Sequence, residues 1–366
     1  MTAAATATPT LITSDKVILG GGGVFTLLAG VADYAHWGAV LAFVLSGAAV
    51  CLLASLVGRS VEQLGDRFGP GATGVLQSAL GNLPELFICI FALQAGLVDV
   101  VRAALVGSIL ANLLLVLGLA FVVGGLRHGT QQLGSERARV IVVLMLLSVA
   151  AMAIPSLAHW LHTPAAAHEK SFSIIVSVLL LALFALTLPF SLRRSSTDEA
   201  GHDDEEDEPP EPPRWPLWLA IGLLAAAGVA AAFVSDWFVN ALTPAMDALS
   251  VNETFAGLVV VAIAGNAIEN VVGVQLAAAD ESAYAFSVIL NSPVQIALVL
   301  APLLVLISQI FGFASLTLVF SPMLVVVLLL AVILAAFIAF DGESTWIEGA
   351  SLIVLYGIVA TSFWWG

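Results

Sequence analysis

The hydrophobic positions of this chain are gathered into long continuous runs, and short polar stretches separate the runs. An α-helix rises 1.5 Å per residue, so roughly 20 apolar residues cross the ~30 Å hydrocarbon core of a bilayer. Strands of a membrane barrel would instead be about 10 residues long and would alternate in polarity. The pattern therefore predicts an all-α polytopic membrane protein with about 11 transmembrane helices. The predicted helices cover residues 17–33, 37–57, 71–96, 99–124, 138–160, 172–191, 216–239, 253–279, 283–309, 315–340 and 346–365.

The composition agrees with this class, because 60% of the 366 residues are hydrophobic and only 10% are charged. Soluble domains carry about 25% charged residues. The N-terminal sequence MTAAATATPTLITSDK lacks the basic start of a secretory signal peptide, so we expect no cleavage.

Lysine and arginine accumulate in the cytoplasmic loops of membrane proteins. Here Arg102 and Lys170 lie in loops on one side of the predicted helices, and the other nine basic residues lie on the side of the N-terminus. The nine are Lys16, Arg59, Arg67, Arg127, Arg137, Arg139, Arg193, Arg194 and Arg214. The distribution predicts a cytoplasmic N-terminus and a C-terminus outside.

One strongly polar segment interrupts the apolar pattern. Residues 197–213, TDEAGHDDEEDEPPEPP, hold nine of the 26 acidic residues and account for most of the net charge of −15. Like charges and prolines favour a solvated linker. The alternative is a segment that attracts or senses a cation. We predict a cytoplasmic loop over residues 192–215 that divides the chain into two halves.

The two halves have the features of an internal repeat. Shifting the chain by 184 residues superimposes GNLPE, residues 81–85, on GNAIE, residues 265–269, and Ser108 on Ser292. Because five predicted helices separate the copies, equivalent helices run in opposite directions, as in the inverted repeats of many secondary transporters. The predicted domains are an N-terminal segment with a leading helix (1–36), a first repeat (37–191), the acidic loop (192–215) and a second, inverted repeat (216–366).

Each copy places one glutamate deep inside an apolar segment. Glu85 and Glu269 have no other acidic residue within ten positions on either side. A charge at bilayer depth costs from about 3 to more than 10 kcal/mol, so such a residue indicates a function by default. The structural alternative is a protonated glutamic acid hydrogen-bonded to a neighbouring helix, which accounts less well for a matched pair.

Amide and helix-breaking residues surround both glutamates. Asn82 and Asn266 lie three positions earlier and would share a helix face with the glutamates. Gly81 and Gly265 permit local unwinding, and Pro84 leaves a helical carbonyl without its donor. Interrupted helices of this kind offer carbonyl oxygens to cations in transporters.

The resulting oxygen set of carboxylates, amides and carbonyls suits a hard cation such as Ca²⁺. The sequence shows no cysteine or histidine cluster of the kind that binds zinc or copper. It indicates no cofactor, and Ca²⁺ would be the transported substrate. Two facing carboxylates hold protons more tightly when no cation is present, and they titrate as a coupled pair. Protons and a divalent ion would therefore compete for one site, which is the physical basis of antiport.

Four segments together resemble the signature regions of the Ca²⁺/H⁺ antiporters, the cation/proton exchanger family of the calcium/cation antiporter superfamily. They are LQSALGNLPELFICIFAL (76–93), ETFAGLVVVAIAGNAIENVVGVQLA (253–277), NSPVQIALVLAPLLVL (291–306) and DGESTWIEGASLIVLYG (341–357). The resemblance covers nearly the whole chain. It implies one leading helix and two inverted five-helix repeats, with Glu85 and Glu269 shared by the cation and the protons.

The resemblance also implies further cation- and proton-binding residues. Asn82 and Asn266 would lie beside the glutamates, while Ser108, Ser292 and Gln295 match polar positions of the adjoining helix in each repeat.

Glu62 and Gln77 are accessory candidates. Glu62 matches an acidic position of the family near a helix end, and the alternative is a solvated interfacial charge. Gln77 departs from the family, which commonly has asparagine there. Asn270 stands where many members have histidine, and Asn291 where glycine is usual. These departures put ion selectivity and pH response in question more than the fold.

The sequence therefore predicts a secondary transporter, not an enzyme, that exchanges Ca²⁺ for H⁺ by alternating access. A Na⁺/H⁺ or K⁺/H⁺ exchanger on the same scaffold is the alternative. An intramembrane hydrolase would need a serine and histidine pair or two aspartates in the spans, which the sequence lacks. A channel would show no coupling to a pH gradient. The expected partners are Ca²⁺, H⁺ and the lipid bilayer, without nucleic acid, and the short loops favour a bacterial inner membrane.

Overall fold

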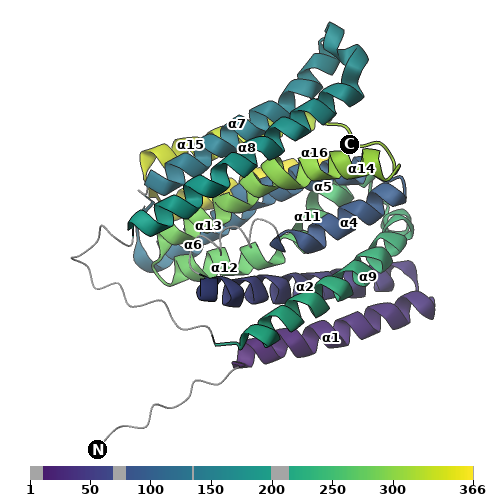
Figure 1. The fold of residues 1–366 in the computed structure, drawn as a ribbon, viewed down its shortest axis with the longest axis horizontal. Coiled ribbons are helices and arrows are strands. Elements are labelled where there is room, and N and C mark those ends of the chain that lie inside the picture. Colours follow the sequence, from purple (N-terminus) through teal and green to yellow (C-terminus); the bar gives the residue numbers. More distant parts are fainter. Residues whose placement is uncertain (1–10, 69–79, 134–135, 199–213, 366) are drawn as a thin grey trace, which may run out of the picture. The chain divides into compact units, whose positions relative to one another are not determined.

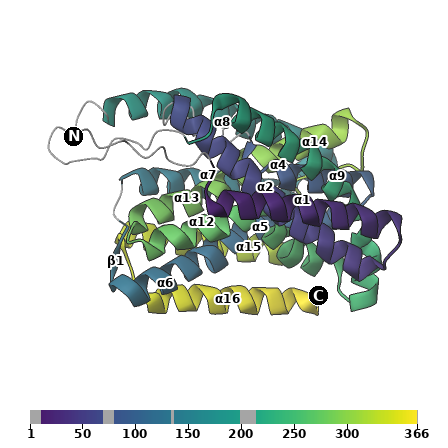
Figure 2. The same cartoon turned by 90° about the horizontal axis from the view of Figure 1, so that it is seen from below.

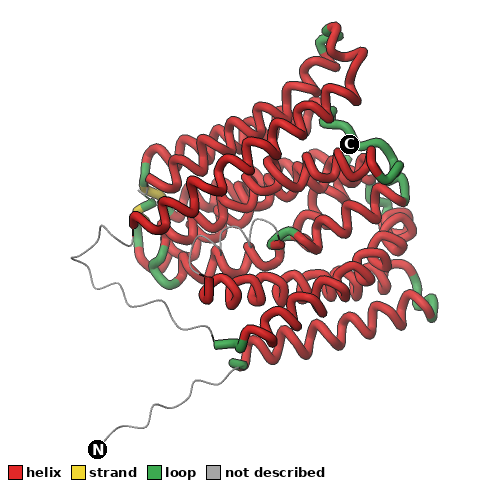
Figure 3. The backbone as a smooth tube through the Cα atoms, in the orientation of Figure 1, coloured by secondary structure: helices red, strands yellow, loops and turns green. Residues whose placement is uncertain are grey.

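A computed structural model describes residues 11–68, 80–133, 136–198 and 214–365, with the side chains at 66, 68, 136–138, 188–198 and 267–270 left out. Its secondary structure is almost entirely helical, which confirms the predicted class (Figure 3). Nine helices within the described residues are long and apolar enough to cross a membrane, and the apolar helices Leu83–Gln94 and Glu253–Gly265 are shorter. The chain forms two compact units. Unit 1 comprises Met1–Pro84 and Leu186–Ala241, and unit 2 comprises Glu85–Ala185 and Leu242–Gly366.

Unit 1 is built on α1 (Thr13–Tyr34), α2 (Ala39–Phe68) and the part of α9 (Leu217–Leu249) up to Ala241. These three helices lie side by side in Figure 1. Gly30 allows the close approach of α1 to α9, because a Cβ atom at this position would come within 2.9 Å of the Trp237 ring. Phe43 and Phe238 stack with their centroids 4.7 Å apart and join α2 to α9.

A buried carboxylate joins the start of α1 to the later part of α2 and to the residues just before α9. Asp15 is only 2% exposed and forms ion pairs with Arg59 of α2 and, at 3.6 Å, with Arg214. The indole of Trp215 donates to the same carboxylate at 3.4 Å, and the Trp215 backbone N–H donates to Gln63 at 3.0 Å. The acidic residues 199–213 end directly before this cluster but lie outside the described residues.

Substituting Asp15 by alanine should lower the free energy of unfolding by about 2 kcal/mol, because two arginines and an indole lose a common acceptor. Thermal unfolding of the purified protein in detergent measures this. Asp99→Ala is the matched control, since Asp99 is 67% exposed and pairs only with Arg102 within its own helix. Equal melting temperatures for both variants would contradict the role of the cluster.

Two long buried helices form the centre of unit 2, and each contains a π-helical turn. The first runs through α5 (Val98–Leu110), η1 (Ala111–Val116) and α6 (Leu117–His128), and the second through α13 (Ser282–Gln295), η4 (Ile296–Leu300) and α14 (Ala301–Ile310). Single π-helical turns often mark functional sites because they expose backbone carbonyls and re-aim side chains. A shift of 184 residues moves 111–116 onto 295–300, so the two turns occur at equivalent positions.

Glycines bring the backbones of unit 2 into contact at two crossings. A Cβ at Gly107 of α5 would lie 2.2 Å from the carbonyl oxygen of Leu258, in the π-helical segment η3 (Ala256–Val261). A Cβ at Gly257 would lie 2.3 Å from the carbonyl oxygen of Val100. Gly118 and Gly349 make a similar crossing between α6 and α16 (Trp346–Trp364), which lie side by side in Figure 2.

An outer pair of helices and an extended segment complete unit 2. Helix α7 (Glu136–Trp160) packs against α15 (Pro322–Asp341), and η2 (Pro164–His168) leads into α8 (Glu169–Asp198), which belongs to this unit up to Ala185. The hydroxyl of Ser156 donates to the carbonyl of Leu318 at 3.0 Å and accepts the N–H of Phe320 at 2.9 Å. The strands β1 (Gln131–Gln132) and β2 (Glu343–Ser344) pair antiparallel and join the ends of α6 and α15.

The predicted helix 315–340 is therefore wrong at its start. The segment before α15 is extended and apolar, and serine hydroxyls satisfy its backbone groups in place of helical hydrogen bonds. Ser321 caps α15 and Pro322 occupies its first position, which fixes the helix start there.

Other predicted boundaries also differ from the structure, and α2 and α9 continue through Phe68 and Leu249, past the predicted ends at 57 and 239. Residues 71–79 of the predicted helix 71–96 lie outside the described residues, and α4 (Leu83–Gln94) begins only after the GN pair. The predicted helix 253–279 is divided at Asn266. It comprises α10 (Glu253–Phe255), η3, α11 (Ala262–Gly265) and α12 (Ala267–Ala278). Helix α8 continues through Asp198, because no glycine or proline follows Pro189 within it.

Candidate functional site

Glu85 lies in the first turn of α4, and its side chain is fully buried. Pro84 precedes it at the second position of the helix, where a missing N–H costs no helical hydrogen bond. Proline therefore starts this helix, whereas the sequence interpretation placed Pro84 inside a longer one. Ser108 of α5 donates a short hydrogen bond to Oε1 of Glu85.

The two copies of the motif meet at Glu85. A Cβ at Gly265, the last residue of α11, would lie 3.4 Å from both Cβ and Cγ of Glu85. The glutamate side chain thus packs directly on the glycine of the second copy. A larger residue at this position would press on the carboxylate.

Asn266 lies at the centre of the polar groups of the site. It lies between α11 and α12 with a non-helical backbone (φ −99°, ψ 22°) and is fully buried. Its Oδ1 accepts hydrogen bonds from Asn112 Nδ2 at 3.0 Å and Ser292 Oγ at 3.3 Å. Its own Nδ2 donates to the carbonyl of Ala262 at 2.9 Å, which fixes the amide orientation because a carbonyl can only accept.

Asn112 is the functional candidate that the sequence interpretation missed. It lies in η1, one turn after Ser108, and donates to the Ser108 carbonyl at 2.9 Å as well as to Asn266. Its Oδ1 is buried and has no hydrogen-bond partner among the described residues. A polar residue in the otherwise apolar run 109–126 was a signal in the sequence, but position 296 of the second half holds isoleucine, so the repeat comparison did not reveal it.

The remaining predicted residues differ in burial and in whether they lie within a helix or in a turn before one. Ser292 and Gln295 are buried in α13. Asn82 is half-buried in the turn before α4, and Asn266 also falls at a helix break, so each asparagine lies just before the helix that carries its glutamate. Gly81 lies in the same turn as Asn82.

Three candidates are exposed or incompletely described. Glu62 is exposed on α2 of unit 1. Gln77 lies outside the described residues. The backbone of Glu269 lies in the first turn of α12, and its side chain is outside the described part.

The site collects oxygen atoms in a setting that favours a cation or a proton. Hydroxyls of Ser108 and Ser292, amide oxygens and one carboxylate are buried together. Helices α4, α11, α12 and α13 contain no lysine or arginine, and Arg102 of α5 is paired with Asp99 and donates to Thr317. A buried carboxylate is stabilised by a proton or a cation. No group of three histidine, cysteine, aspartate or glutamate residues is placed to hold a metal within the described ranges.

Residues 38–193 and 219–365 match the family described as Sodium/calcium exchanger protein. The chain is 35% identical to a Ca²⁺/H⁺ antiporter of Synechocystis sp. (strain ATCC 27184 / PCC 6803 / Kazusa), over 93% of this chain and 95% of that protein. It is 33% identical to the Ca²⁺/H⁺ antiporter ChaA of Bacillus subtilis (strain 168), over 90% and 93%.

Two solved structures have the same fold. The structure of native YfkE superimposes with a TM-score of 0.81 at 31% identity, covering 95% of this chain and all of that one. An H⁺/Ca²⁺ exchanger, CAX, gives a TM-score of 0.73 at 17% identity, covering 96% and 92%. The predicted resemblance to the Ca²⁺/H⁺ antiporters is confirmed, and the protein is an integral membrane transporter. The chain belongs to the sodium/calcium exchanger protein family.

Proposed function

We propose that this protein exchanges Ca²⁺ for H⁺ across its membrane by alternating access. The observation that carries the proposal is the burial of Glu85 among hydroxyl and amide groups contributed by α5, η1, α13 and the break at Asn266. Relatives covering nearly the whole chain are Ca²⁺/H⁺ antiporters. Hard oxygen ligands of this kind suit Ca²⁺.

Glu85 and Glu269 are the proposed carboxylates shared by the cation and the protons. A Ca²⁺ ion between them would stabilise both ionised forms, and its departure would raise their affinity for protons. Asn82, Asn266, Ser108, Ser292 and Gln295 would supply neutral oxygens, with Ca²⁺ as substrate and no cofactor required. Glu62 and Gln77 remain accessory candidates.

Alternating access would arise from two inverted five-helix repeats after one leading helix, eleven helices in total. The matching π-helical turns in α5–α6 and α13–α14 support the repeat, as do the equivalent breaks at Asn82 and Asn266. Discontinuous helices that meet at such breaks carry the ion sites in many transporters of this build.

We also propose a bacterial inner membrane as the location, with the N-terminus in the cytoplasm and the C-terminus outside. Homologues from bacteria support the membrane, and the distribution of lysine and arginine supports the orientation. Exchange of Na⁺ or K⁺ for H⁺ is the alternative substrate choice on the same scaffold.

Uptake of Ca²⁺ into liposomes with an acidic interior tests the proposal directly. The purified protein should accumulate Ca²⁺ while the pH gradient lasts, and excess Na⁺ or K⁺ should compete little. Transport of Na⁺ or K⁺ without transport of Ca²⁺ would favour the alternative, a Na⁺/H⁺ or K⁺/H⁺ exchanger. Passive Ca²⁺ flux without proton coupling would indicate a channel.

Replacing Asn112 by leucine should raise the Ca²⁺ concentration for half-maximal transport about tenfold, because Asn266 and Ser292 lose the amide that orients their oxygens. The leucine is similar in volume, so the packing of η1 changes little. Concentration dependence of uptake measures the effect. Ser287→Ala, on α13 but bonded only to the carbonyl of Ala283, is the control. An unchanged half-maximal concentration would remove Asn112 from the site.

A further inference from the structure

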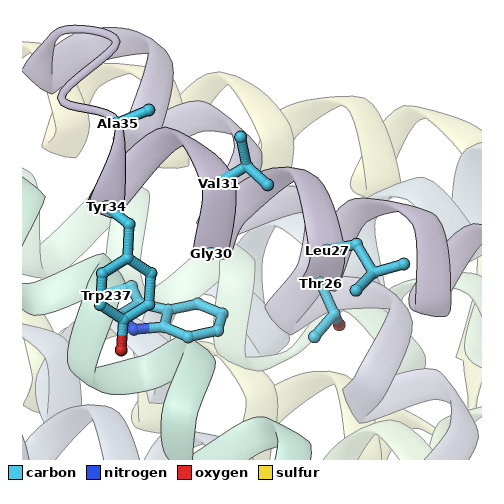
Figure 4. A pocket seen from close by; sticks show the side chains of 7 residues that line it. All are labelled: Thr26, Leu27, Gly30, Val31, Tyr34, Ala35 and Trp237. Carbon is cyan, nitrogen blue, oxygen red and sulfur yellow. The ribbon is translucent and has the colours of Figure 1, made fainter.

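Ionisable side chains gather where α6 and α12 end in unit 2. The two helices lie side by side (Figure 2), and Arg127 and His128 belong to the last turn of α6. The hollow of about 450 Å³ beside α1 differs from this region. It is lined by Leu27, Val31, Trp237 and other apolar or hydroxyl-bearing residues (Figure 4), and none of its lining residues carries a carboxylate, an amine or an imidazole.

Helix α12 ends in a Schellman turn. The N–H of Glu281 donates to the carbonyl of Leu276 at 3.0 Å, and the N–H of Asp280 donates to the carbonyl of Ala277 at 3.4 Å. These are the two hydrogen bonds that define this turn. The carbonyl of Ala278 takes part in neither of them, and the negative end of the helix dipole is concentrated on such terminal carbonyls.

Two side chains of α6 reach the carbonyl of Ala278. Nη1 of Arg127 donates to it at 3.3 Å, and Nε2 of His128 lies 3.1 Å from it. Because a carbonyl oxygen can only accept, Nε2 carries a hydrogen in this contact. Nδ1 of the same ring lies 3.9 Å from Oδ1 of Asp280. The imidazole therefore satisfies both neighbours only when both of its nitrogens are protonated and the ring is charged.

The backbone at Asp280 is unusual. Its φ of 71° lies in the left-handed region, where glycine is the common residue at the end of a helix. An aspartate there costs conformational energy, and strain of this kind is found at functional positions. In return, the chain gains a carboxylate beside His128 that a glycine would not supply.

Other carboxylates on the elements that meet here do not pair with His128. They are Glu281 before α13, Asp341 at the end of α15, Glu343 of β2 and Glu348 of α16. Gln132 donates to Glu343 at 3.0 Å, and the N–H of Thr345 donates to Glu348 at 2.7 Å. Among the described residues, Asp280 is the carboxylate that pairs with His128.

The amino end of α12 adjoins the proposed ion site. This helix begins after the non-helical backbone of Asn266, and Glu269 lies in its first turn. A helix joined to its neighbour through such a break can tilt as a rigid body, unless its far end is held. We propose that protonated His128 holds the carboxyl end of α12 and so restrains the helix that carries Glu269.

The contact of His128 depends on pH in a definite direction. Histidine changes its charge between about pH 5 and pH 8. The charged ring is attracted by Asp280 and by the helix dipole, so the contact is stronger at about pH 6 and weaker at about pH 8, where the ring is neutral. Arg127 stays charged throughout and supplies a constant part. The consequence for transport rests on the proposed exchange function, whereas the contact itself does not.

Hydrogen–deuterium exchange of the purified, full-length protein measures the hold on α12 without transport. His128→Gln removes the charge but keeps an amide donor. At about pH 6 the backbone amides at the end of α12 should exchange about threefold faster in this variant than in the unchanged protein, the size expected for one charge at an exposed helix end. At about pH 8 the two proteins should agree. His128→Lys should agree with the unchanged protein at about pH 6 and exchange about threefold more slowly at about pH 8.

Three further variants separate titration from packing. Arg127→Gln should accelerate deuterium exchange by the same factor at both pH values, because arginine does not titrate there. Asp280→Asn keeps a residue that tolerates the left-handed backbone, and it should remove part of the hold at about pH 6 only. His168→Gln, at an exposed histidine of η2, is the control and should change neither value.

Exchange of Ca²⁺ for Ca²⁺ in liposomes, with equal pH on both sides, measures the consequence for transport. His128→Gln should be about threefold faster than the unchanged protein at about pH 6 and equal to it at about pH 8. Equal deuterium exchange of the two proteins at about pH 6, or the same difference at both pH values, would overturn the proposal. Altered deuterium exchange with equal transport rates would also overturn it. No Ca²⁺ exchange by the unchanged protein would contradict the proposed function instead, and the deuterium result would then decide on the contact alone.

Discussion

Replacing Glu85 by glutamine is expected to abolish proton-driven Ca²⁺ uptake, with a rate at least about 100-fold below that of the unchanged protein, or ~2.7 kcal/mol. Glutamine keeps an oxygen at Oε1, so the hydrogen bond from Ser108 and the packing on Gly265 both persist. The substitution removes the negative charge that attracts Ca²⁺. It also removes the carboxyl group that carries a proton in the half of the cycle without Ca²⁺. The fold should therefore survive while exchange does not.

Uptake into liposomes with an acidic interior measures the loss, and thermal unfolding in detergent verifies the fold. Glu253→Gln is the matched control, because Glu253 is an exposed acid at the start of α10 on the same chain segment as the second motif. Exchange at the normal rate by the Glu85 variant would exclude this carboxylate from the transport cycle. A melting temperature far below that of the control would instead give Glu85 a structural role.

The sequence allowed the class of fold and the central residues to be predicted because both depend on strong local signals. A glutamate alone in an apolar run is so costly in a membrane that its position indicates function without any structure. Ser108 and Ser292 followed from the 184-residue shift, and the structure places Ser108 on Glu85 and Ser292 on Asn266.

What the sequence did not reveal depends on contacts between segments distant along the chain. Asn112 has no polar counterpart in the second half, so only the packing of η1 against Asn266 identifies it. The start of α15 was misplaced because the residues before Pro322 are as apolar as a helix, and the serine hydroxyls that satisfy their backbone come from α7 and α8. Hydropathy does not distinguish a buried extended segment from a helix.

The crossing of α5 and η3 is expected to be the most sensitive packing contact of unit 2. A Cβ at Gly107 would lie 2.2 Å from the carbonyl oxygen of Leu258 and 2.5 Å from its Cα. These are backbone atoms, so no side-chain rotation relieves the overlap and the two helices must separate. Gly107→Ala should therefore lower the free energy of unfolding by about 3 kcal/mol or more.

The same substitution should also reduce exchange in the molecules that remain folded. Gly107 immediately precedes Ser108, and η3 leads through α11 to Gly265 and Asn266, so separating the helices moves the hydroxyl away from Glu85. Gly222→Ala is the matched control, since no atom lies within 4 Å of a Cβ at that position in α9. It should leave stability unchanged or raise it by up to about 1 kcal/mol, because alanine favours a helix over glycine. Equal melting temperatures for the two alanine variants would show that the helices can separate at this crossing without loss of stability. A contact other than this crossing would then have to position Ser108 against the carboxylate of Glu85.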